Sequence, residues 1–412
     1  MTCNLTPPAD GEGRSLDFRG LRIAMVTETY PPEVNGVANT VCRVVMGLRG
    51  RGHAVQLIRP RQPAVDTGTS EGDGETVLTG GVALPMYGHL RMGLPHHRLL
   101  RALWRQQRPD VVHIATEGPL GWSALRVARQ LDLPVCADFR TNFQAYSRFY
   151  GAGWLRRPIM AYLRRFHNGC HSTMVPTDTL RTQLSREGFG ALSVVARGVD
   201  TELFSPARRD RALRASWNAS DDDVVVLHVG RLAAEKNLSV LATAFRGLQE
   251  VCPRVRLVVV GDGPARQALQ SQCPAAVFAG FRTGDALAAH YASSDIFLFP
   301  SLTETYGNVT PEAMASGLAV VAFDDAAAGQ LITHGQSGLL VPKGRAEDFP
   351  AAAIQLAHDQ DLRKRLGQMA RERVERLGWA SVIRHVEDVY GLTTARASHR
   401  AFDHGLTEVG RI

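Results

Sequence analysis

The chain has 412 residues, of which 47 are basic and 40 acidic, so its formal charge is +7. Hydrophobic residues make up 44% of it, which excludes a disordered protein, and the length predicts two or three domains. No apolar run approaches the roughly 20 residues of a membrane-spanning helix, and the six scattered cysteines argue against a zinc site or a disulfide framework. Residues 1–20 form a polar tail without an apolar signal core, so a cytoplasmic protein is expected.

In the first half of the chain, short β-branched runs alternate with amphipathic stretches of helix length. Arg22–Glu28 is predicted to be a buried strand, Gly36–Gly50 a helix and Arg61–Gly81 a loop. Further strands are predicted at Ala54–Arg59, Val82–Leu84, Asp110–Ala115, Pro134–Phe139, Ser172–Pro176 and Ser193–Arg197. This alternation predicts a parallel sheet covered by helices on both faces, in a domain of residues 21–200.

The alternation restarts after a polar stretch, residues 201–223, which is predicted to be the linker between domains. A second domain, residues 224–376, has strands predicted at Val224–Val229, Val255–Val260, Val277–Phe281, Ile296–Pro300, Ala319–Phe323 and Leu339–Val341. Two doubly wound domains leave a cleft between them, and such folds bind ligands at the carboxyl ends of their strands. A helix at 377–392 is expected to cross back to the first domain, and 393–412 to be a frayed polar tail.

Basic charge is concentrated in one region. The segment from Arg91 to Arg165 contains 13 arginines and four acidic residues, a formal charge of +9. Nucleic acid, anionic lipid and a phosphorylated substrate are all partners that such charge would attract. Alternatively, the chain simply prefers arginine, because it has only three lysines. No nucleic-acid-binding module is visible, so binding to nucleic acid is not expected.

Two glycine-containing loops follow strands of the second domain. In the loop Gly230–Lys236, Arg231 and Lys236 could converge on one phosphate group if the loop folds back. The turn Gly261-Asp262-Gly263-Pro264 resembles the start of a dinucleotide fingerprint, but the third glycine is replaced by Arg266. It therefore does not predict an NAD enzyme, and a tight strand-to-helix turn explains it equally well.

The segment Glu304–Glu312 carries the strongest signal. Thr310 is predicted to be a helix N-cap, and Pro311 the first helical residue, so Gly307–Thr310 would lead into a helix N-terminus that favours an anion. Glu304 and Glu312 stand beside this anion site, where carboxylates can grip sugar hydroxyls or stabilise developing positive charge. For Glu312 alone, a helix start that favours a carboxylate is an equally good explanation.

Together these features resemble the retaining GT-B glycosyltransferases of family 4. The resemblance rests on Glu304 and Glu312 with seven residues between them, the Arg231–Lys236 loop, the Gly261–Pro264 turn and the Asn35-Gly36 loop. It runs from about Arg22 to Tyr390, with the motifs in the family's order. Within the family, the chain is most similar to bacterial GDP-mannose-dependent mannosyltransferases and to glycolipid-forming transferases. The resemblance implies two Rossmann-like domains, the second holding a nucleotide-sugar donor of the GDP-mannose or UDP-glucose type and the first an acceptor.

The resemblance also implies roles for individual residues. Arg231 and Lys236 would grip the diphosphate and stabilise the leaving group, Glu312 would contact the donor ribose and Glu304 the transferred sugar. Gly36 would let a first-domain loop approach the donor. The donor-binding set implied in this way is Gly36, Gly230, Arg231, Lys236, Gly261, Gly263, Gly307, Asn308, Val309, Thr310 and Glu312.

One residue departs from the family's pattern. The family often has a histidine after the strand equivalent to Pro134–Phe139, near the reacting sugar, and here Arg140 stands at that position. This puts any acid/base role there in doubt and suggests a different contact to the sugar or acceptor. His113, at the end of its strand, is a weaker candidate, because a lone strand histidine is more often structural.

No metal or other cofactor is expected. Asp221-Asp222-Asp223 formally matches an Asp-x-Asp metal motif, but it lies far in sequence from the donor motifs and is predicted to be a solvated turn. Arg231, Lys236 and the expected helix N-terminus would already supply the positive potential that a diphosphate needs.

The segment Phe139–Phe166 holds eight aromatic residues and six arginines. Its second part, from Leu155 to Phe166, has the pattern of a basic amphipathic helix, which can lie on an anionic bilayer. The alternative is a helix packed on its own sheet with its arginines in solvent. The first interpretation predicts a protein that is peripheral on the inner face of the cytoplasmic membrane.

These observations predict a retaining hexosyltransferase that moves mannose or glucose from a nucleotide-diphosphate sugar to an acceptor, expected to be a membrane lipid. The runner-up is a sugar-nucleotide epimerase or hydrolase of the same architecture, which should show further acid/base residues in the cleft. Rapid turnover of the donor without an acceptor would favour this runner-up. A nucleic-acid-binding protein is the third alternative, and a steep salt dependence of binding to random duplex would revive it.

Overall fold

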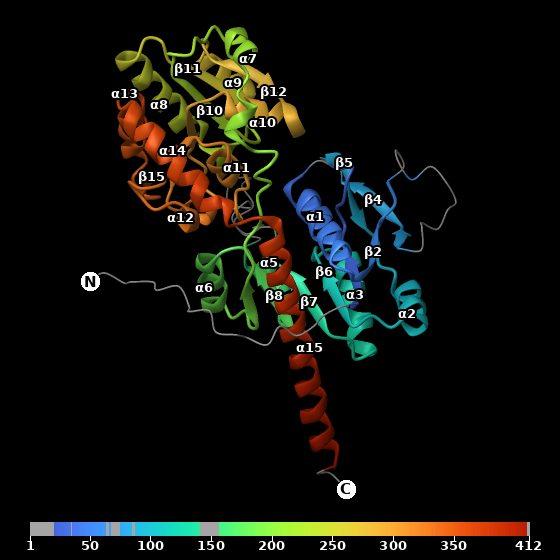
Figure 1. The fold of residues 1–412 in the computed structure, drawn as a ribbon. Helices are drawn as coiled ribbons and strands as arrows, with labels where there is room; N and C mark the ends of the chain where they lie inside the picture. The colour runs from blue at the N-terminus through green and yellow to red at the C-terminus, as the bar shows by residue number, and fades with distance from the viewer. Residues whose placement is uncertain are drawn as a thin grey trace, which may run out of the picture.

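The structure, a computed structural model, describes residues 20–33, 35–62, 66, 75–84, 87–140 and 156–409. The chain forms two lobes, each built on a parallel sheet, and a long C-terminal helix runs from one lobe along the other (Figure 1). The expected α/β class with two Rossmann-like, doubly wound domains is therefore observed.

The N-terminal sheet has seven parallel strands in the order β3-β2-β1-β6-β7-β8-β9. They are β1 (Arg22–Val26), β2 (Ala54–Pro60), β3 (Thr76–Thr79), β6 (Val111–Ile114), β7 (Val135–Asp138), β8 (Ser172–Val175) and β9 (Leu192–Val194). Alternate residues of β1 enter opposite cores: Ile23 packs with α1 (Gly36–Gly50), and Ala24 with α2 (His97–Gln106) and α3 (Pro119–Gln130). Helices α5 (Arg156–His167) and α6 (Asp178–Arg186) extend the cover on the α3 side. Both faces are thus buried, as the continuous apolar strands require.

Two strands differ from the sequence-based expectation. β3 lies inside the stretch Arg61–Gly81, which was expected to be a loop because it is rich in Gly, Thr and Asp. The run Val82–Leu84 belongs to β4 (Gly81–Leu84), which pairs antiparallel with β5 (Tyr87–Gly93) in a separate two-stranded sheet. A short polar edge strand carries little hydrophobic pattern, which explains why β3 escapes detection.

The C-terminal sheet has six parallel strands in the order β12-β11-β10-β13-β14-β15. They are β10 (Val225–Val229), β11 (Arg256–Val260), β12 (Val277–Gly280), β13 (Ile296–Phe299), β14 (Ala319–Phe323) and β15 (Leu339–Val341). The helices are α8 (Leu238–Val251), α9 (Arg266–Gln272), α10 (Gly284–Ala292), α11 (Val309–Ala315), α12 (Ala326–Leu331), α13 (Phe349–His358) and α14 (Gln360–Glu375). The strand order reverses between β10 and β13, which is where doubly wound folds bind their ligands.

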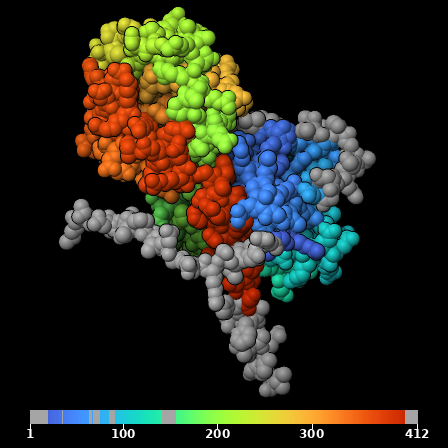
Figure 2. Space-filling model, in the orientation of Figure 1, coloured from blue at the N-terminus to red at the C-terminus, as the bar shows by residue number. Residues whose placement is uncertain are grey.

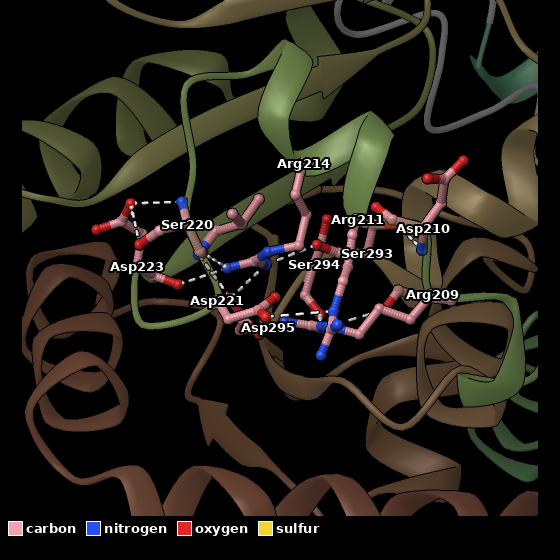
Figure 3. Close-up of polar contacts among 12 residues, drawn as sticks. Arg209, Asp210, Arg211, Arg214, Ser220, Asp221, Asp223, Ser293, Ser294 and Asp295 are labelled. Carbon is pink, nitrogen blue, oxygen red and sulfur yellow. Dashed lines mark hydrogen bonds and ion pairs between the residues drawn. The ribbon is translucent and has the colours of Figure 1, made fainter.

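The stretch 201–223, expected to be a linker, is part of the C-terminal domain. It contains the 3₁₀ turn η2 (Pro206–Arg208) and α7 (Arg211–Ser216), and Phe204 and Trp217 lie in the core. Arg214, 1% exposed, donates to the carbonyls of Ser293 and Asp223 and to the Asp295 carboxylate (Figure 3). The Arg214 guanidinium and the Asp295 carboxylate neutralise each other, so a segment that is polar in sequence still packs in the protein interior.

The same network accounts for the acidic run. Asp223 accepts from the Ser220 backbone and pairs with Arg254 at 2.5 Å, while Asp221 and Asp222 are exposed. The run therefore closes the end of the sheet where β10 begins, opposite the edge with the glycine loops.

Helix α15 (Trp379–Val409) leaves the C-terminal domain and packs on the N-terminal one. Ile383, Val386, Val389 and Tyr390 share a core with α1. Figure 2 shows this segment, in red, against the blue N-terminal lobe. A frayed tail was expected from residue 393 onward, whereas the helix continues to Val409 and Thr393 is fully buried.

Candidate active site

Loops from the two domains meet at the carboxyl ends of the two sheets. Arg197, which follows β9, lies 3.4 Å through Nη1 from Oδ1 of Asn308, which precedes α11. The Asn308 amide nitrogen lies 3.5 Å from where a side chain on Gly36 would begin. Residues that were predicted from separate motifs, Gly36 and Asn308, are therefore neighbours across the domain junction.

The Gly230–Lys236 loop folds back on itself, as its proposed chemistry requires. The 3₁₀ turn η3 (Ala234–Lys236) reverses the chain, so that Lys236 Cε comes within 3.9 Å of the missing Cβ position of Gly230. Arg231 pairs with the buried Glu235. Both cations thus border the end of β10, at the point where the strand order reverses.

Lys236 also joins this loop to the one after β13. Its Nζ pairs with the Glu304 carboxylate, which accepts a second hydrogen bond from Ser301 Oγ at 2.8 Å. The ammonium lies 5.3 Å from the centre of the Phe299 ring. An ammonium and a carboxylate that neutralise each other here can be separated by a ligand that offers a phosphate to one and hydroxyls to the other.

The glycines of the Gly261–Pro264 turn have a visible packing role. A Cβ on Gly261 would lie 2.0 Å from the Gly230 carbonyl oxygen, and one on Gly263 would lie 2.4 Å from that of Leu232. Both residues have positive φ, at 129° and 157°. They allow the loop after β11 to press against the cationic loop after β10, so their contribution to a donor site is to shape its wall.

Helix α11 begins earlier than expected. Asn308 is its N-cap and Val309 its first residue, whereas Thr310, the expected N-cap, lies inside the helix and is buried. The pattern Thr-Pro mimics an N-cap and first position, but the backbone of Asn308 is already helical. Gly307, at φ 88°, makes the turn that leads into this helix.

Glu312 lies on the first turn of α11. Tyr291 Oη donates to its Oε2 at 3.0 Å. Burial raises the pKa of the Glu312 carboxyl to about 7, although the Tyr291 hydrogen bond partly opposes this. Near neutral pH this residue therefore exchanges between a carboxylate and a neutral acid, which makes its binding properties dependent on pH.

On the N-terminal side, Arg140 is held by Asp138. Arg140 Nε donates to Asp138 Oδ2 at 2.8 Å, and His113 Nε2 contacts the same oxygen at 2.8 Å. Burial would raise the pKa of Asp138, but the charge of Arg140 and the hydrogen bonds from His113 and Arg140 hold it well below its usual range. These three side chains line one cavity, which Thr40, Val386 and Arg197 also border.

Arg197 is the site residue that sequence reasoning missed. Burial, reinforced by the neighbouring charge of Arg140, lowers its pKa to about 10. No carboxylate of the described residues lies within salt-bridge distance of it, and the Tyr306 ring centre is 5.7 Å from its Cζ. Its only sequence signal is its position, a basic residue just after a strand on the ligand-binding edge.

The helix expected to lie on a membrane is packed differently. In α5, Met160, Leu163 and Phe166 are buried against the N-terminal sheet, so its apolar face is not open to a bilayer. Arg156 pairs with Glu187 at 3.2 Å, and Arg157 and Arg165 are exposed. The packed-helix alternative is therefore the observed one. Phe143, Tyr146, Phe149, Tyr150 and Trp154 lie outside the described residues.

Within the described ranges, no group of three or more His, Cys, Asp and Glu side chains is arranged to hold a metal ion. Nor does any helix of that part of the chain combine the length and apolar character needed to cross a membrane.

Comparison with known proteins places these features in a family. The family model Glycosyltransferase Family 4 matches residues 34–203, and Glycosyl transferases group 1 matches residues 223–359. The GDP-mannose-dependent alpha-mannosyltransferase of Mycobacterium tuberculosis is 38% identical over 92% of this chain and 100% of its own length. The alpha-monoglucosyldiacylglycerol synthase of Streptococcus pneumoniae is 27% identical over 78% of this chain and 75% of its own.

Solved structures agree on the architecture. The sucrose-phosphate synthase from Thermosynechococcus elongatus superposes with a TM-score of 0.72 and 20% identity, over 91% of this chain and 99% of its own. At that identity the likeness establishes the fold, which is GT-B.

Proposed function

The chain belongs to the family 4 glycosyltransferases of the GT-B fold, and from this premise we propose that it transfers a hexose from a nucleotide-diphosphate sugar to a lipid acceptor with retention of configuration. The observation that carries the proposal is the contact between Lys236 and Glu304 at the reversal point of the C-terminal sheet. It puts a phosphate-binding cation and a hydroxyl-binding carboxylate side by side, which is what the two halves of such a donor require.

The donor would occupy the C-terminal edge of the cleft. Arg231 and Lys236 would bind its diphosphate and stabilise the negative charge that develops as the sugar leaves. Glu312 would accept hydrogen bonds from the ribose, and Glu304 from the transferred sugar. The backbone of Gly307–Thr310 would lie along the sugar and the phosphates, facing Gly36 across the junction.

The proposed reaction needs no protein base. The bond between the sugar's anomeric carbon and the diphosphate oxygen breaks, and the acceptor oxygen forms a new bond to that carbon on the same face. The acceptor hydroxyl proton passes to the departing diphosphate oxygen. Arg140, which stands where many family members have a histidine, would contact the sugar or acceptor as a fixed cation and would not transfer a proton.

The proposed donor and acceptor are based on the substrates for which similar proteins are named. A relative named as GDP-mannose-dependent supports GDP-mannose as donor, with a UDP-glucose type donor as the alternative. The glucosyldiacylglycerol synthase and the phosphatidyl-myo-inositol mannosyltransferase of Mycolicibacterium smegmatis, 29% identical over 90% of this chain, support a membrane lipid as acceptor. The reaction would take place at the cytoplasmic face of the membrane, with the protein bound peripherally.

Donor binding and product stereochemistry test the proposal. Thermal unfolding would be measured with GDP-mannose, UDP-glucose, GDP and UDP, because a ligand that binds only the folded state raises the unfolding temperature by mass action. The donor that stabilises the protein would then be incubated with diacylglycerol-based acceptors, and the anomer of the product assigned by NMR. We expect an α-linked product from an α-linked donor. An inverted product, or donor turnover that does not need an acceptor, would contradict the proposal.

A further inference from the structure

Arg140 is the last member of a hydrogen-bonded series that begins on the C-terminal helix. Tyr390 Oη lies 2.8 Å from His113 Nδ1, His113 Nε2 lies 2.8 Å from Asp138 Oδ2, and Arg140 Nε and Nη2 both donate to that same oxygen. The four residues come from α15, β6, β7 and the segment after β7. All four are buried, with Arg140 the most exposed at 9%.

The direction of these hydrogen bonds follows from the charge on Asp138. Arg140 and His113 keep the pKa of Asp138 far below its usual range against the effect of burial, so it is an ionised acceptor. His113 Nε2 must then carry a hydrogen, and we assign the neutral imidazole with Nδ1 as acceptor. Burial raises the pKa of Tyr390 well above its ordinary value, so its hydroxyl keeps its proton and donates to Nδ1.

This series determines where the Arg140 guanidinium lies. Nε and Nη2 are used by Asp138, which leaves Nη1 for the cavity that Arg140 lines. A carboxylate with only one partner could rotate about its own bond, whereas Asp138 Oδ2 is bound by His113 as well as by Arg140. His113 in turn is held by Tyr390, with the two rings edge to face at 5.7 Å.

We propose that Tyr390 and His113 are positioning residues, which hold Arg140 at the cleft through Asp138 and so make the C-terminal helix part of the site. The proposal rests on the proposed function, because it assumes that Arg140 contacts the sugar or the acceptor. It goes beyond it by giving a task to a residue 277 positions away from His113 in the chain, on the helix that follows the C-terminal domain.

A structural role alone would predict something different. Tyr390 also packs in the core with α1, so its loss could act simply by weakening the fold. Positioning acts only through Arg140, and it should therefore disappear when Arg140 is absent. The donor nucleotide is held by the other domain, so its KM should not change when the Arg140 side chain is displaced.

The experiment is a double-mutant cycle on the full-length enzyme with Tyr390→Phe and Arg140→Met. We expect Tyr390→Phe to lower kcat by about five- to tenfold, of the order of one buried hydrogen bond, with donor KM unchanged. In the Arg140→Met background the same change should have no further effect. Thr393→Val, which removes a buried hydroxyl from the same helix without touching His113, is the matched control and should leave kcat at the wild-type value.

If the Tyr390→Phe protein folds poorly, a second pair of variants tests the same positioning role. In His113→Gln the amide can replace Nε2 as donor to Asp138, and in His113→Asn it cannot reach, so the Gln variant should keep the higher kcat. Equal losses from Tyr390→Phe with and without Arg140, or equal activity of the two His113 variants, would overturn the positioning role. So would an Arg140→Met enzyme of wild-type activity. If wild type itself transfers no sugar, the proposed function fails, and this proposal with it.

Discussion

Lys236 and Glu304, 68 residues apart in the chain, form an ion pair that joins the loop after β10 to the loop after β13. Side chains of both residues are mostly buried, at 11% and 15% exposure. In a site without a donor the pair keeps two buried charges neutral. In the proposed reaction, Lys236 would exchange Glu304 for a phosphate and Glu304 would exchange Lys236 for sugar hydroxyls, so that both charges would already be in place when the donor binds.

This pair leads to the first prediction. Replacing Lys236 with Met removes the ammonium but keeps most of the side-chain volume over Phe299. We expect kcat/KM for transfer to fall by about 100- to 1,000-fold, because one charged contact to a developing charge contributes about 2.7–4 kcal/mol. Lys364→Met, which removes an exposed ammonium on α14, is the control and should be active. Unchanged turnover of Lys236→Met would refute the phosphate-binding role.

Arg231 allows an independent test of the same role. Its guanidinium pairs with Glu235, which is fully buried. Arg231→Lys keeps the charge but loses the planar fork, so we expect it to transfer sugar more slowly than wild type but faster than Arg231→Ala. Circular dichroism and thermal unfolding would separate loss of activity from loss of fold. An Arg231→Ala enzyme with wild-type kinetics would contradict the assignment.

Transfer should not require a divalent metal. Arg231, Lys236 and Arg197 already supply positive charge around the cleft, and Arg197 has no salt bridge among the described residues. Activity measured in excess chelator should equal that of the untreated enzyme. Complete loss of activity that magnesium or manganese restores would show that a metal takes part.

Donor affinity should depend on pH through Glu312. Burial raises its pKa to about 7, so the carboxylate that would accept the ribose hydroxyls is lost as the pH falls below that value. The KM for the donor should therefore rise severalfold between pH 8 and pH 6. Glu312→Gln should bind the donor more weakly at pH 8 and show no such rise. The exposed Glu347→Gln variant should behave as wild type. A wild-type KM that is flat over this range would rule out the proposed ribose contact.

Glu117 should make stability fall as the pH rises. It follows β6, and its buried Oε1 has no hydrogen-bond partner among the residues that the structure describes. Burial, reinforced by the charges of Glu28 and Asp138, raises its pKa to about 8 from an ordinary value of 4.5. Folding therefore takes up a proton between these values. The favourable contribution is complete below pH 4.5 and disappears as the pH rises through 8.

A neutral side chain at position 117 should remove this dependence of stability on pH. The free energy of unfolding of Glu117→Gln, relative to wild type, should grow by about 2 kcal/mol between pH 6 and pH 8. Urea unfolding at several pH values measures this difference, and the exposed Glu250→Gln variant should show none. A constant difference would mean that Glu117 is ionised in the folded protein throughout.

The sequence predicted the two sheets well because parallel strands are continuous apolar runs. β14 and β15 coincide with their predicted ranges, and β3, which is polar, was missed. The prediction that residues 201–223 form a linker is wrong for the opposite reason. Arg214 and Asp295 are charged, which suggests an exposed segment, but they neutralise each other in the interior. Charge complementarity between distant residues has no local signature.

The same limit applies to the site. Residues that belong to a local motif can be predicted from sequence as candidate site residues, as Glu304, Lys236 and Glu312 were. Arg197 was not, because it becomes a site residue only when the two domains meet at Asn308. In the sequence alone His113 is a lone strand histidine, and its partners Asp138 and Tyr390 become visible only when β7 and α15 are placed beside it.

Because the apolar face of α5 is buried, peripheral membrane binding would depend on the exposed arginines alone. Exposed arginines lie on α2, α3 and α5, which cover the same face of the N-terminal sheet: Arg98, Arg105, Arg126, Arg129, Arg157 and Arg165. Burial lowers the pKa of His97 on α2, and the charges of Arg126 on α3 and of Arg101 lower it further, because these basic groups lie close together on this face. Since each basic residue near an anionic surface contributes about 1 kcal/mol, several of them would bind the protein reversibly.

Co-sedimentation with vesicles of neutral lipid alone, and with added phosphatidylglycerol, tests this interpretation. We expect wild type to sediment only with the anionic vesicles at low salt and to be released at high salt, because the Debye length shrinks from about 30 Å at 0.01 M to about 3 Å at 1 M. Replacing Arg98, Arg105, Arg157 and Arg165 with Ser should remove about 4 kcal/mol of binding and leave the protein in the supernatant. Changing Lys364, Arg365, Arg373 and Arg376 of α14 and its C-terminus to Ser lowers the charge equally on the other domain, and this control should still sediment. Wild-type protein that stays in solution under every condition would favour a soluble acceptor, because an enzyme that does not bind the membrane would not reach a lipid within it.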